Sequence, residues 1–323
     1  MAGGQEKALK RRVKSIQSTK KITRAMELIA ATRVVKAQQR AQAARPYAEQ
    51  ITEVIQHLSQ AGAGKEHPLL RQADTLAKVA FVVITSDRGL AGAYNTSVIR
   101  AAERDLQGAQ TDGADYSLVL IGKKAASYFA FRNYRIDASF TDMSDTPRYE
   151  DARRVAEVVT DAFVDGDVDQ VRLVYTRFIS AASQRVVVRR FMPLRAVAAE
   201  EGDGGLTADY EYEPSPGEIF DRLLPRYVEA RLFAAMLDAA ASEHAARQRA
   251  MKAATDNAEE LITKLTRIMN RARQDAITTE IMEIVGGAEA LRAGASGDDS
   301  DYLVDSIGSS DYFTERQPQG SRT

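Results

Sequence analysis

The chain has 323 residues, of which 44% are hydrophobic and 28% charged, and its formal net charge is −1. This size predicts two domains, or one domain with a long appendage, and the balanced charge selects no class of partner. With no cysteine and three histidines, the composition excludes a disulfide scaffold and a cysteine nucleophile and disfavours a multi-histidine metal site. No run approaches the roughly 18 apolar residues of a membrane span, and the basic N-terminus lacks the apolar core of a signal peptide, so we expect a soluble, intracellular chain.

Two long stretches contain no glycine, one at 5–61 and the other at 218–285. Both are rich in Ala, Leu, Glu, Gln, Lys and Arg, which favour helix. They predict an N-terminal helix over 1–60 and a C-terminal helix over 214–291. Helices of this length, at about 1.5 Å per residue, are too long to fit inside a compact domain and must project from it.

The middle of the chain, 70–212, has a different pattern. Short apolar runs rich in β-branched residues alternate with helical stretches, which predicts an α/β domain with a parallel sheet covered on both faces. The expected strands lie at 79–84, 118–121, 171–175 and, at an edge, 185–191. The expected helices lie near 94–107, 123–132 and 148–164.

The two long helices are predicted to run antiparallel as a coiled coil, because one enters the middle domain and the other leaves it. Paired positions should then sum to about 275. Leu261, Leu265, Ile268 and Ala272 have the 4-3-4 spacing of a coiled-coil seam. The apolar series then skips five residues to Ile277, so we infer that 273–291 extends beyond its partner helix.

The last segment, 292–323, reads as a disordered acidic tail, because it is rich in Gly, Ser and Asp and shows no periodicity. Residues 298–323 carry six acids against two arginines. Residues 1–45 show the opposite bias, with twelve Lys or Arg against two acids.

Four segments resemble sequence motifs of a known family, the gamma subunits of F-type ATP synthases. They read SIQSTKKITRAME (15–27), SDRGLAGAYN (86–95), MKAATDNA (251–258) and NRARQDAITTEI (270–281), the last continuing to Ala288. The resemblance covers about 3–291 and leaves the tail outside. Four motifs in their proper order make it highly specific.

The resemblance implies an antiparallel coiled coil inside a ring of three alpha and three beta subunits, with a Rossmann-like domain at its base. The chain would be a central rotor shaft. It would couple proton-driven rotation of the membrane c-ring to conformational change and ATP synthesis at the beta-subunit catalytic sites, with the epsilon subunit as a further partner. It implies no catalytic site, cofactor or metal on the chain itself, and no insertion into the membrane.

The resemblance also implies site residues. Contact or coupling to the beta subunits falls on Met26, Arg88, Arg247, Arg273, Gln274, Thr278 and Glu280. Contact with the c-ring and epsilon subunit falls on Tyr210 and Tyr212. The alternative interpretations are ordinary ones: Met26 as a seam residue, the C-terminal four as surface polar residues of a helix, and the two tyrosines as packing on the domain.

Two other motifs admit alternatives. The loop 86–92 lies between a strand and a helix, where phosphate-binding loops occur. It has neither the GxGxxG nor the GxxxxGK(S/T) spacing of such loops, which disfavours nucleotide binding. The two remaining interpretations are a contact with a beta subunit and a strand-to-helix turn that needs glycine for its geometry. The basic N-terminal helix could bind nucleic acid, face acidic loops of a collar, or face solvent. No aromatic residue precedes Tyr47, so single strands would find no stacking platform.

The rival functions are a Rossmann-like enzyme and a coiled-coil nucleic-acid binder. Within the resembled family, the chloroplast form carries a cysteine-bearing regulatory insert that a chain without cysteine lacks. We therefore expect a peripheral subunit on the cytoplasmic face of a bacterial plasma membrane, with the mitochondrial matrix as the alternative.

Overall fold

The structure is a computed structural model that describes residues 2–60, 67–194 and 213–295. By their contacts, the residues form two compact units. The larger unit is 16–260, and the smaller combines 1–15 with 261–323. Tyr210, Tyr212 and the predicted tail beyond 295 lie outside the described residues.

A five-stranded sheet forms the centre of the larger unit, in the order β3-β2-β1-β4-β5. Its strands are β1 (Lys78–Ile84), β2 (Asp115–Ile121), β3 (Ala138–Phe140), β4 (Gln170–Phe178) and β5 (Gln184–Met192). Strands β1 to β4 pair in parallel, and β5 pairs antiparallel to β4 at the edge. The predicted strands fall within β1, β2, β4 and β5, so the prediction of a parallel sheet with a further edge strand is confirmed.

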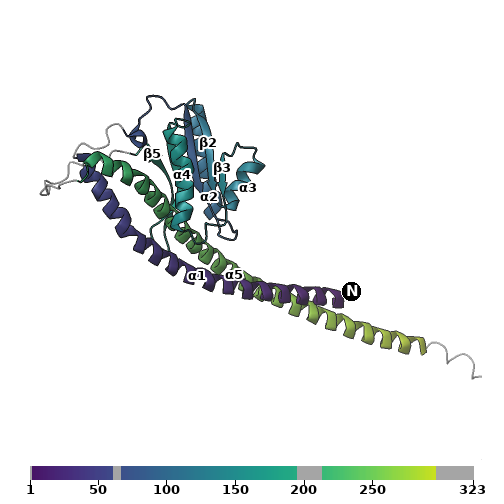
Figure 1. Cartoon of the computed structure of the whole chain (residues 1–323). Helices are drawn as coiled ribbons and strands as arrows, with labels where there is room; N and C mark the ends of the chain where they lie inside the picture. The colour runs from purple at the N-terminus through teal and green to yellow at the C-terminus, as the bar shows by residue number, and fades with distance from the viewer. Residues whose placement is uncertain (1, 61–66, 195–212, 296–323) are drawn as a thin grey trace, which may run out of the picture. The chain divides into compact units, whose positions relative to one another are not determined.

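Helices cover both faces of this sheet (Figure 1). They are α2 (Tyr94–Thr111), α3 (Lys123–Phe131) and α4 (Tyr149–Val164), with a short 3-10 turn at Pro68–Leu70. On one face, the core joins the sheet to α2 and α3. On the other, it joins the sheet to α4 and to the two long helices, α1 (Ala2–Gln60) and α5 (Pro216–Ala295).

Helix α1 has its least exposed positions at alternating spacings of three and four residues. The run is Glu6, Leu9, Val13, Ile16, Lys20, Thr23, Glu27, Ala30, Val34, Ala37, Ala41, Ala44, Ala48, Ile51, Ile55 and Leu58, each buried or half-buried. This seven-residue repeat keeps one stripe of the helix covered along its length. Much of the stripe is alanine, so a neighbouring helix can approach closely.

Helices α1 and α5 meet in antiparallel order within the larger unit. The Thr23 and Thr255 hydroxyls lie 2.8 Å apart, and Lys20 Nζ lies 3.0 Å from Glu259 Oε1. These pairs sum to 278 and 279, so the predicted sum of 275 was short by about one helical turn. By the same sums, Met26 lies at the level of residues 252–253 of α5, where a sum of 275 would give 249.

The predicted seam of α5 is also corrected. Leu261 and Ile268 are 48% and 42% exposed, whereas Leu265 and Ala272 are half-buried as expected. The covered positions are Met251, Thr255, Ala258, Ile262, Leu265, Met269, Ala272 and Ala276. The prediction was therefore wrong at Leu261 and Ile268, where the covered residues are the next ones along the helix, Ile262 and Met269.

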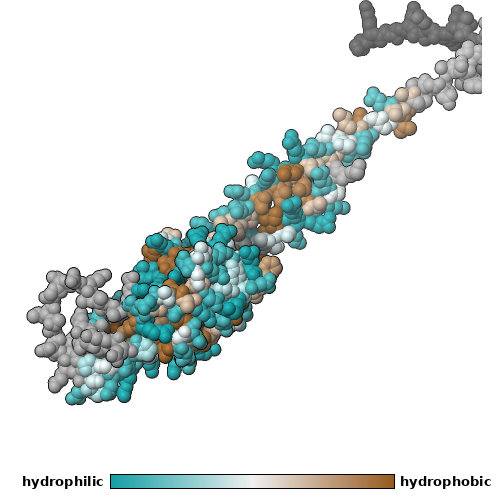
Figure 2. Space-filling model, turned by 90° about the horizontal axis from the view of Figure 1, so that it is seen from above, coloured by the Kyte–Doolittle hydropathy of each residue, from teal (hydrophilic) through white to brown (hydrophobic). Residues whose placement is uncertain are grey.

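The side chains at the end of α5, in the smaller unit, are exposed to solvent. Every described side chain from 277 to 293 is exposed, including Ile277, Ile281, Ile284 and Leu291. Apolar side chains accordingly reach the surface among hydrophilic ones (Figure 2). The helix continues through Gly286 to Ala295, beyond its predicted end at 291. Among the described residues, no helix combines the length and hydrophobicity needed to cross a bilayer.

Gly122, between β2 and α3, has no room for a side chain. Its φ is +97°, and a Cβ there would lie 2.3 Å from the Thr85 carbonyl oxygen. We expect Gly122→Ala to lower the free energy of unfolding by about 2 to 4 kcal/mol, measured by denaturant titration. The control is Gly108→Ala in α2, where a Cβ meets nothing within 4 Å; it should raise stability by up to about 1 kcal/mol. Equal effects of the two changes would contradict this reading of the turn.

Candidate functional site

The loop after β1 is held by side chains from two directions. Ser86 is fully buried; its backbone N–H and its hydroxyl each lie 2.9 Å from Asn95 Oδ1. Asp87 N donates to Ser144 Oγ at 2.8 Å, and Ser144 N donates back to Asp87 Oδ2 at 3.0 Å. These bonds fix the loop to the first turn of α2 and to the segment that follows β3, while Arg88 remains exposed.

The carboxylate of Asp87 is a structural anion. Partial burial acts to raise its pKa, but hydrogen bonds from the backbone of Asp142, from Ser144 and from the Lys123 N–H outweigh burial and lower the pKa below its usual range. Asp87 therefore stays charged and holds the loop at neutral pH.

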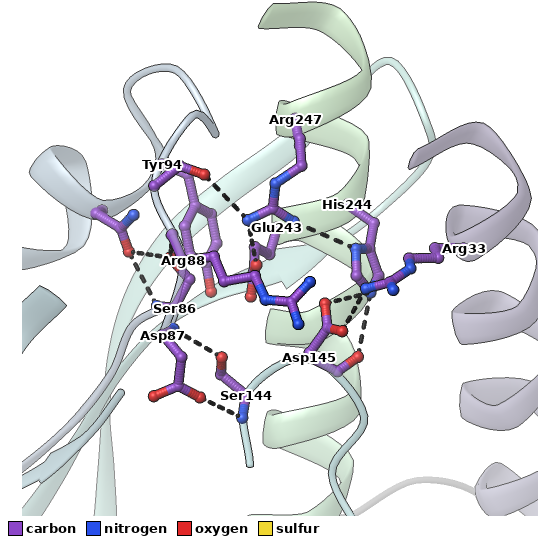
Figure 3. Close-up of polar contacts among 12 residues, drawn as sticks. Arg33, Ser86, Asp87, Arg88, Tyr94, Ser144, Asp145, Glu243, His244 and Arg247 are labelled. Carbon is purple, nitrogen blue, oxygen red and sulfur yellow. Dashed lines mark hydrogen bonds and ion pairs between the residues drawn. The ribbon is translucent and has the colours of Figure 1, made fainter. Parts of the chain in front are cut away.

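Arg247 of α5 lies beneath this loop in a buried polar network (Figure 3). Its guanidinium donates to Glu243 Oε1 at 2.6 Å and to the Gly89 carbonyl at 3.3 Å. The Nη1 atom lies 3.5 Å from His244 Nδ1. Arg247 thus links the long C-terminal helix to the backbone of the loop that bears Arg88.

Asp145 extends the network to α1. His244 Nε2 lies 3.1 Å from the Asp145 carbonyl, and Arg33 of α1 forms an ion pair with the Asp145 carboxylate. Two turns further along α1, Arg40 donates to the Pro147 carbonyl at 2.7 Å. The segment between β3 and α4 is therefore bound to both long helices.

Burial dominates the electrostatics of this network. It raises the pKa of Glu243 to about 7 against the attraction of Arg247. It also lowers the pKa of His244, so the imidazole is neutral near pH 7. With its proton on Nε2, that ring donates to the Asp145 carbonyl and accepts from Arg247 at Nδ1.

Asp145, Glu243 and His244 place ligand-type atoms within 4.8 Å of one another. Such a group can hold a cation, but Arg33 and Arg247 already pair with its two carboxylates. A metal ion would have to displace both guanidiniums. The arrangement is better described as a balanced ion network that joins the loop, the sheet domain and the long helices.

The residues expected from the sequence do not gather at one place. Met26 is half-buried on α1, Arg88 is exposed on the loop, and Arg247 is buried beneath it. The remaining four, Arg273, Gln274, Thr278 and Glu280, are exposed along α5 in the smaller unit. Tyr210 and Tyr212 lie outside the described residues.

Sequence reasoning missed Arg33, Asp145, Glu243 and His244. The only local signal was the spacing of Glu243 and Arg247, four residues apart on a helix and so on one face. Asp145 meets Arg33 across 112 positions and His244 across 99, and no sequence pattern reports such pairs.

Known structures share this fold. A chain of the mitochondrial ATP synthase of Euglena gracilis, in a structure of OSCP, F1 and c-ring, matches with a TM-score of 0.64 and 19% identity, covering 95% of this chain and 100% of that one. A chain from the central stalk and c-ring of the Tetrahymena thermophila enzyme matches with a TM-score of 0.56 and 23% identity, covering 72% of this chain and 99% of that one. The fold is therefore that of a chain class found in ATP synthase assemblies.

Sequence comparison narrows the class. The ATP synthase family model matches residues 5–291. The ATP synthase gamma chain of Frankia casuarinae is 49% identical over 296 residues, covering 90% of this chain and 99% of that one. The gamma chain of Kineococcus radiotolerans is 46% identical, covering 91% and 99%. The chain belongs to the ATP synthase gamma chain family, whose members are non-catalytic stalk subunits.

Proposed function

We propose that the chain is the central rotor shaft of a bacterial F-type ATP synthase. Rotation of the membrane c-ring turns it, and its asymmetric surface imposes different conformations on three otherwise identical beta subunits. The observation that carries the proposal is the family match across 5–291, which spans the sheet domain and both long helices. Energy passes through the chain because each beta conformation contacts a different face of it.

The long helices supply the stiffness. The three-four alternation of covered positions on α1 and the contact between Thr23 and Thr255 support an antiparallel coiled coil formed by the two ends of the chain. Two helices that interlock resist twisting better than one, so torque applied at the sheet domain reaches the far end of the shaft.

The beta-subunit contacts lie on two parts of the chain. On the exposed end of α5, Gln274 and Thr278 lie one turn apart, with Arg273 and Glu280 beside them. An arginine next to an amide can hold a carboxylate and a carbonyl of a beta subunit in fixed geometry. On the sheet domain, exposed Arg88 is the contact.

Arg247 and Met26 act differently from these contacts. Arg247 is 8% exposed and binds the Gly89 carbonyl, so it positions the loop that carries Arg88 and couples that loop to α5. Met26 is half-buried on α1. There it shapes the shaft surface that the beta subunits meet, and a charge at this position would disturb coupling.

The partners follow from the assembly. Three alpha and three beta subunits surround the shaft, and the epsilon subunit and c-ring meet its base through Tyr210 and Tyr212. The chain is a peripheral subunit on the cytoplasmic face of the plasma membrane, supported by its similarity to bacterial gamma chains.

A rotation assay tests the proposal. Because the chain has no cysteine, Phe131→Cys, at a side chain 82% exposed, gives a single attachment point for a bead. Purified with its cognate alpha and beta subunits, the labelled chain should belong to an ATP-hydrolysing complex, and the bead should turn in one direction when ATP is added. The chain alone should neither hydrolyse ATP nor bind it at micromolar concentration. Failure to co-purify, or a complex that hydrolyses ATP while the bead stays still, would refute the shaft assignment.

A further inference from the structure

A groove rich in arginine runs along one face of the larger unit, where β4 and β5 meet the two long helices. A cavity of about 250 Å³ is lined by Arg177 of β4, Arg189 and Arg190 of β5, and Arg231 of α5. It adjoins a larger hollow of about 600 Å³ along α1, and the two share Asp238 in their walls. The smaller cavity thus has four arginines and one acid in its wall, and the wall of the larger hollow adds Arg45, Glu49 and Glu53.

The arginines around this groove differ in whether a described carboxylate forms an ion pair with them. Arg45 pairs with Glu49, and Arg172 pairs with Asp105. Arg177, Arg189 and Arg190 form no ion pair with any carboxylate of the residues that the structure describes. Four arginines beside a single carboxylate leave an excess of positive charge on the surface of the smaller cavity, and such an excess favours an anionic partner.

The strand register makes the cluster costly. Arg177 of β4 lies directly opposite Arg185 of β5, and Arg172 lies opposite Arg190. Like charges placed opposite each other across strands are destabilising. The two pairs lie five residues apart along β4, so they are at separate places and on opposite faces of the sheet. Arg172 already pairs with Asp105, whereas Arg177 and Arg185 form no ion pair with a described residue, so an anion bound beside Arg177 would offset their repulsion.

The shape and donor pattern of the groove distinguish among anions. Asp238 has no hydrogen bond or ion pair to a described residue, and burial raises its pKa to about 6 despite the attraction of Arg177, Arg45 and Arg189. A phosphate concentrates its negative charge at one centre, which this carboxylate would repel. A polypeptide offers carboxylates to the arginines and backbone N–H groups to Asp238. The outer edge of β5 also pairs with no described strand, which leaves backbone groups for an extended segment.

We propose that this groove docks an acidic polypeptide segment of a neighbouring subunit of the ATP synthase. The proposal rests on the proposed function, because the assembled complex supplies the neighbour. Arg231 marks the inner end of the site: its guanidinium lies 5.5 Å from the ring centre of Phe191 and 5.4 Å from that of Tyr227. Those contacts hold it in place to receive a carboxylate.

Binding to the full-length chain tests the chemistry. The probe is a short fluorescein-labelled peptide of alternating glutamate and alanine. Its binding to the chain is measured by fluorescence anisotropy at low and high salt. The triple variant Arg177→Gln/Arg189→Gln/Arg190→Gln should bind it about tenfold more weakly or worse. The control Arg100→Gln/Arg104→Gln/Arg222→Gln removes the same charge from exposed positions elsewhere and should change the affinity by less than about twofold. Equal losses in the two variants would overturn the site.

Two further experiments test whether phosphate or the chain's own acidic segment occupies the groove instead. Inorganic phosphate at matched ionic strength should not displace the peptide; displacement would show a small-anion site and overturn the proposal. The chain's own acidic segment is removed as a competitor by neutralising Glu200, Glu201, Asp203, Asp209 and Glu211. A gain of about tenfold in peptide affinity in that variant would show that this segment fills the groove, which also overturns the proposal.

The last experiment tests the groove in the assembled complex. A photo-crosslinking residue at Ile179, 61% exposed and in the wall of the larger hollow, should capture another subunit at a stretch rich in Asp or Glu, and the triple variant should lose that product. If the complex assembles and hydrolyses ATP but yields no such product, this inference fails while the proposed function stands. If the chain does not assemble at all, the proposed function itself fails.

Discussion

Replacing Arg247 by methionine should lower the free energy of unfolding by about 3 to 5 kcal/mol at about pH 8. The reason is that Glu243 is 1% exposed and its Oε1 atom accepts a hydrogen bond from Arg247 at 2.6 Å. Without the guanidinium, a buried carboxylate keeps its cost of desolvation and loses the charge that compensates it. The loss is measured by urea denaturation of the full chain, followed by circular dichroism.

The effect of pH gives this prediction a second measurement. Burial raises the pKa of Glu243 from 4.5 to about 7, so the folded state holds this proton more tightly than the unfolded state. The stability that this proton contributes is complete below about pH 4.5 and is lost as pH rises through about 7. The cost of Arg247→Met should therefore shrink as pH falls below 7, because Glu243 becomes neutral.

Arg249 supplies the matched control. It lies two residues away on the same helix but is exposed, and it donates to the Ala181 carbonyl at 2.7 Å. Arg249→Met should cost less than about 1 kcal/mol and show no change with pH across this range. A cost for Arg247→Met that matched this control, or that stayed constant from pH 5 to 8, would contradict the assignment of the buried network.

The elements of the sheet domain were predictable because their patterns are local. Runs such as 79–84 are continuously apolar and β-branched, and a strand buried on both faces in a parallel sheet needs that composition. Strand β3 was missed because Ala138–Phe140 is three residues long, too short to show any period. Its parallel pairing with β2 depends on contacts distant in sequence.

The long helices were predictable, but the faces they cover were not. Alanine and threonine fill much of the covered stripe, including Ala30, Ala37 and Thr255, while Ile22, at 60% exposed, points outward. Reasoning that places the largest apolar residues inside therefore chose neighbouring positions. Small residues allow two helices to approach closely, while larger apolar side chains such as Ile22 stay exposed.

The polar network beneath the loop was not predictable from sequence. Its members come from α1, from the segment after β3 and from α5, and the pairing of Arg33 with Asp145 depends on the fold that brings these segments together. The prediction of a beta-subunit contact at Arg247 came from family resemblance. The structure adds a physical role that resemblance did not contain, the bond to the Gly89 carbonyl.

The residues at the exposed end of α5, unlike those of the buried network, have few contacts with other described residues. Arg273 and Gln274 are both exposed, and their side chains form no hydrogen bond or ion pair with a described residue. The Gln274 carbonyl accepts a hydrogen bond from the Thr278 hydroxyl at 3.0 Å, within the same helix. Their side chains do not stabilise the described structure. If they function, they do so against another subunit.

The double variant Arg273→Leu/Gln274→Leu should therefore reduce ATP synthesis by the assembled complex about tenfold or more, while the helix content of the isolated chain stays unchanged. A hydrogen bond to a charged group is worth about 1.5 to 3 kcal/mol, and each 1.4 kcal/mol is a factor of ten in rate if the contact acts in the transition state of a rotary step. Leucine preserves the helix because its helix propensity is close to that of arginine and glutamine. The control Arg11→Leu/Arg12→Leu changes two exposed residues of α1 and should have a smaller effect.

Synthesis is measured in membrane vesicles energised by a proton gradient, after gel analysis has shown equal amounts of assembled complex. A double variant that assembled normally and synthesised ATP at the wild-type rate would remove Arg273 and Gln274 from the coupling mechanism.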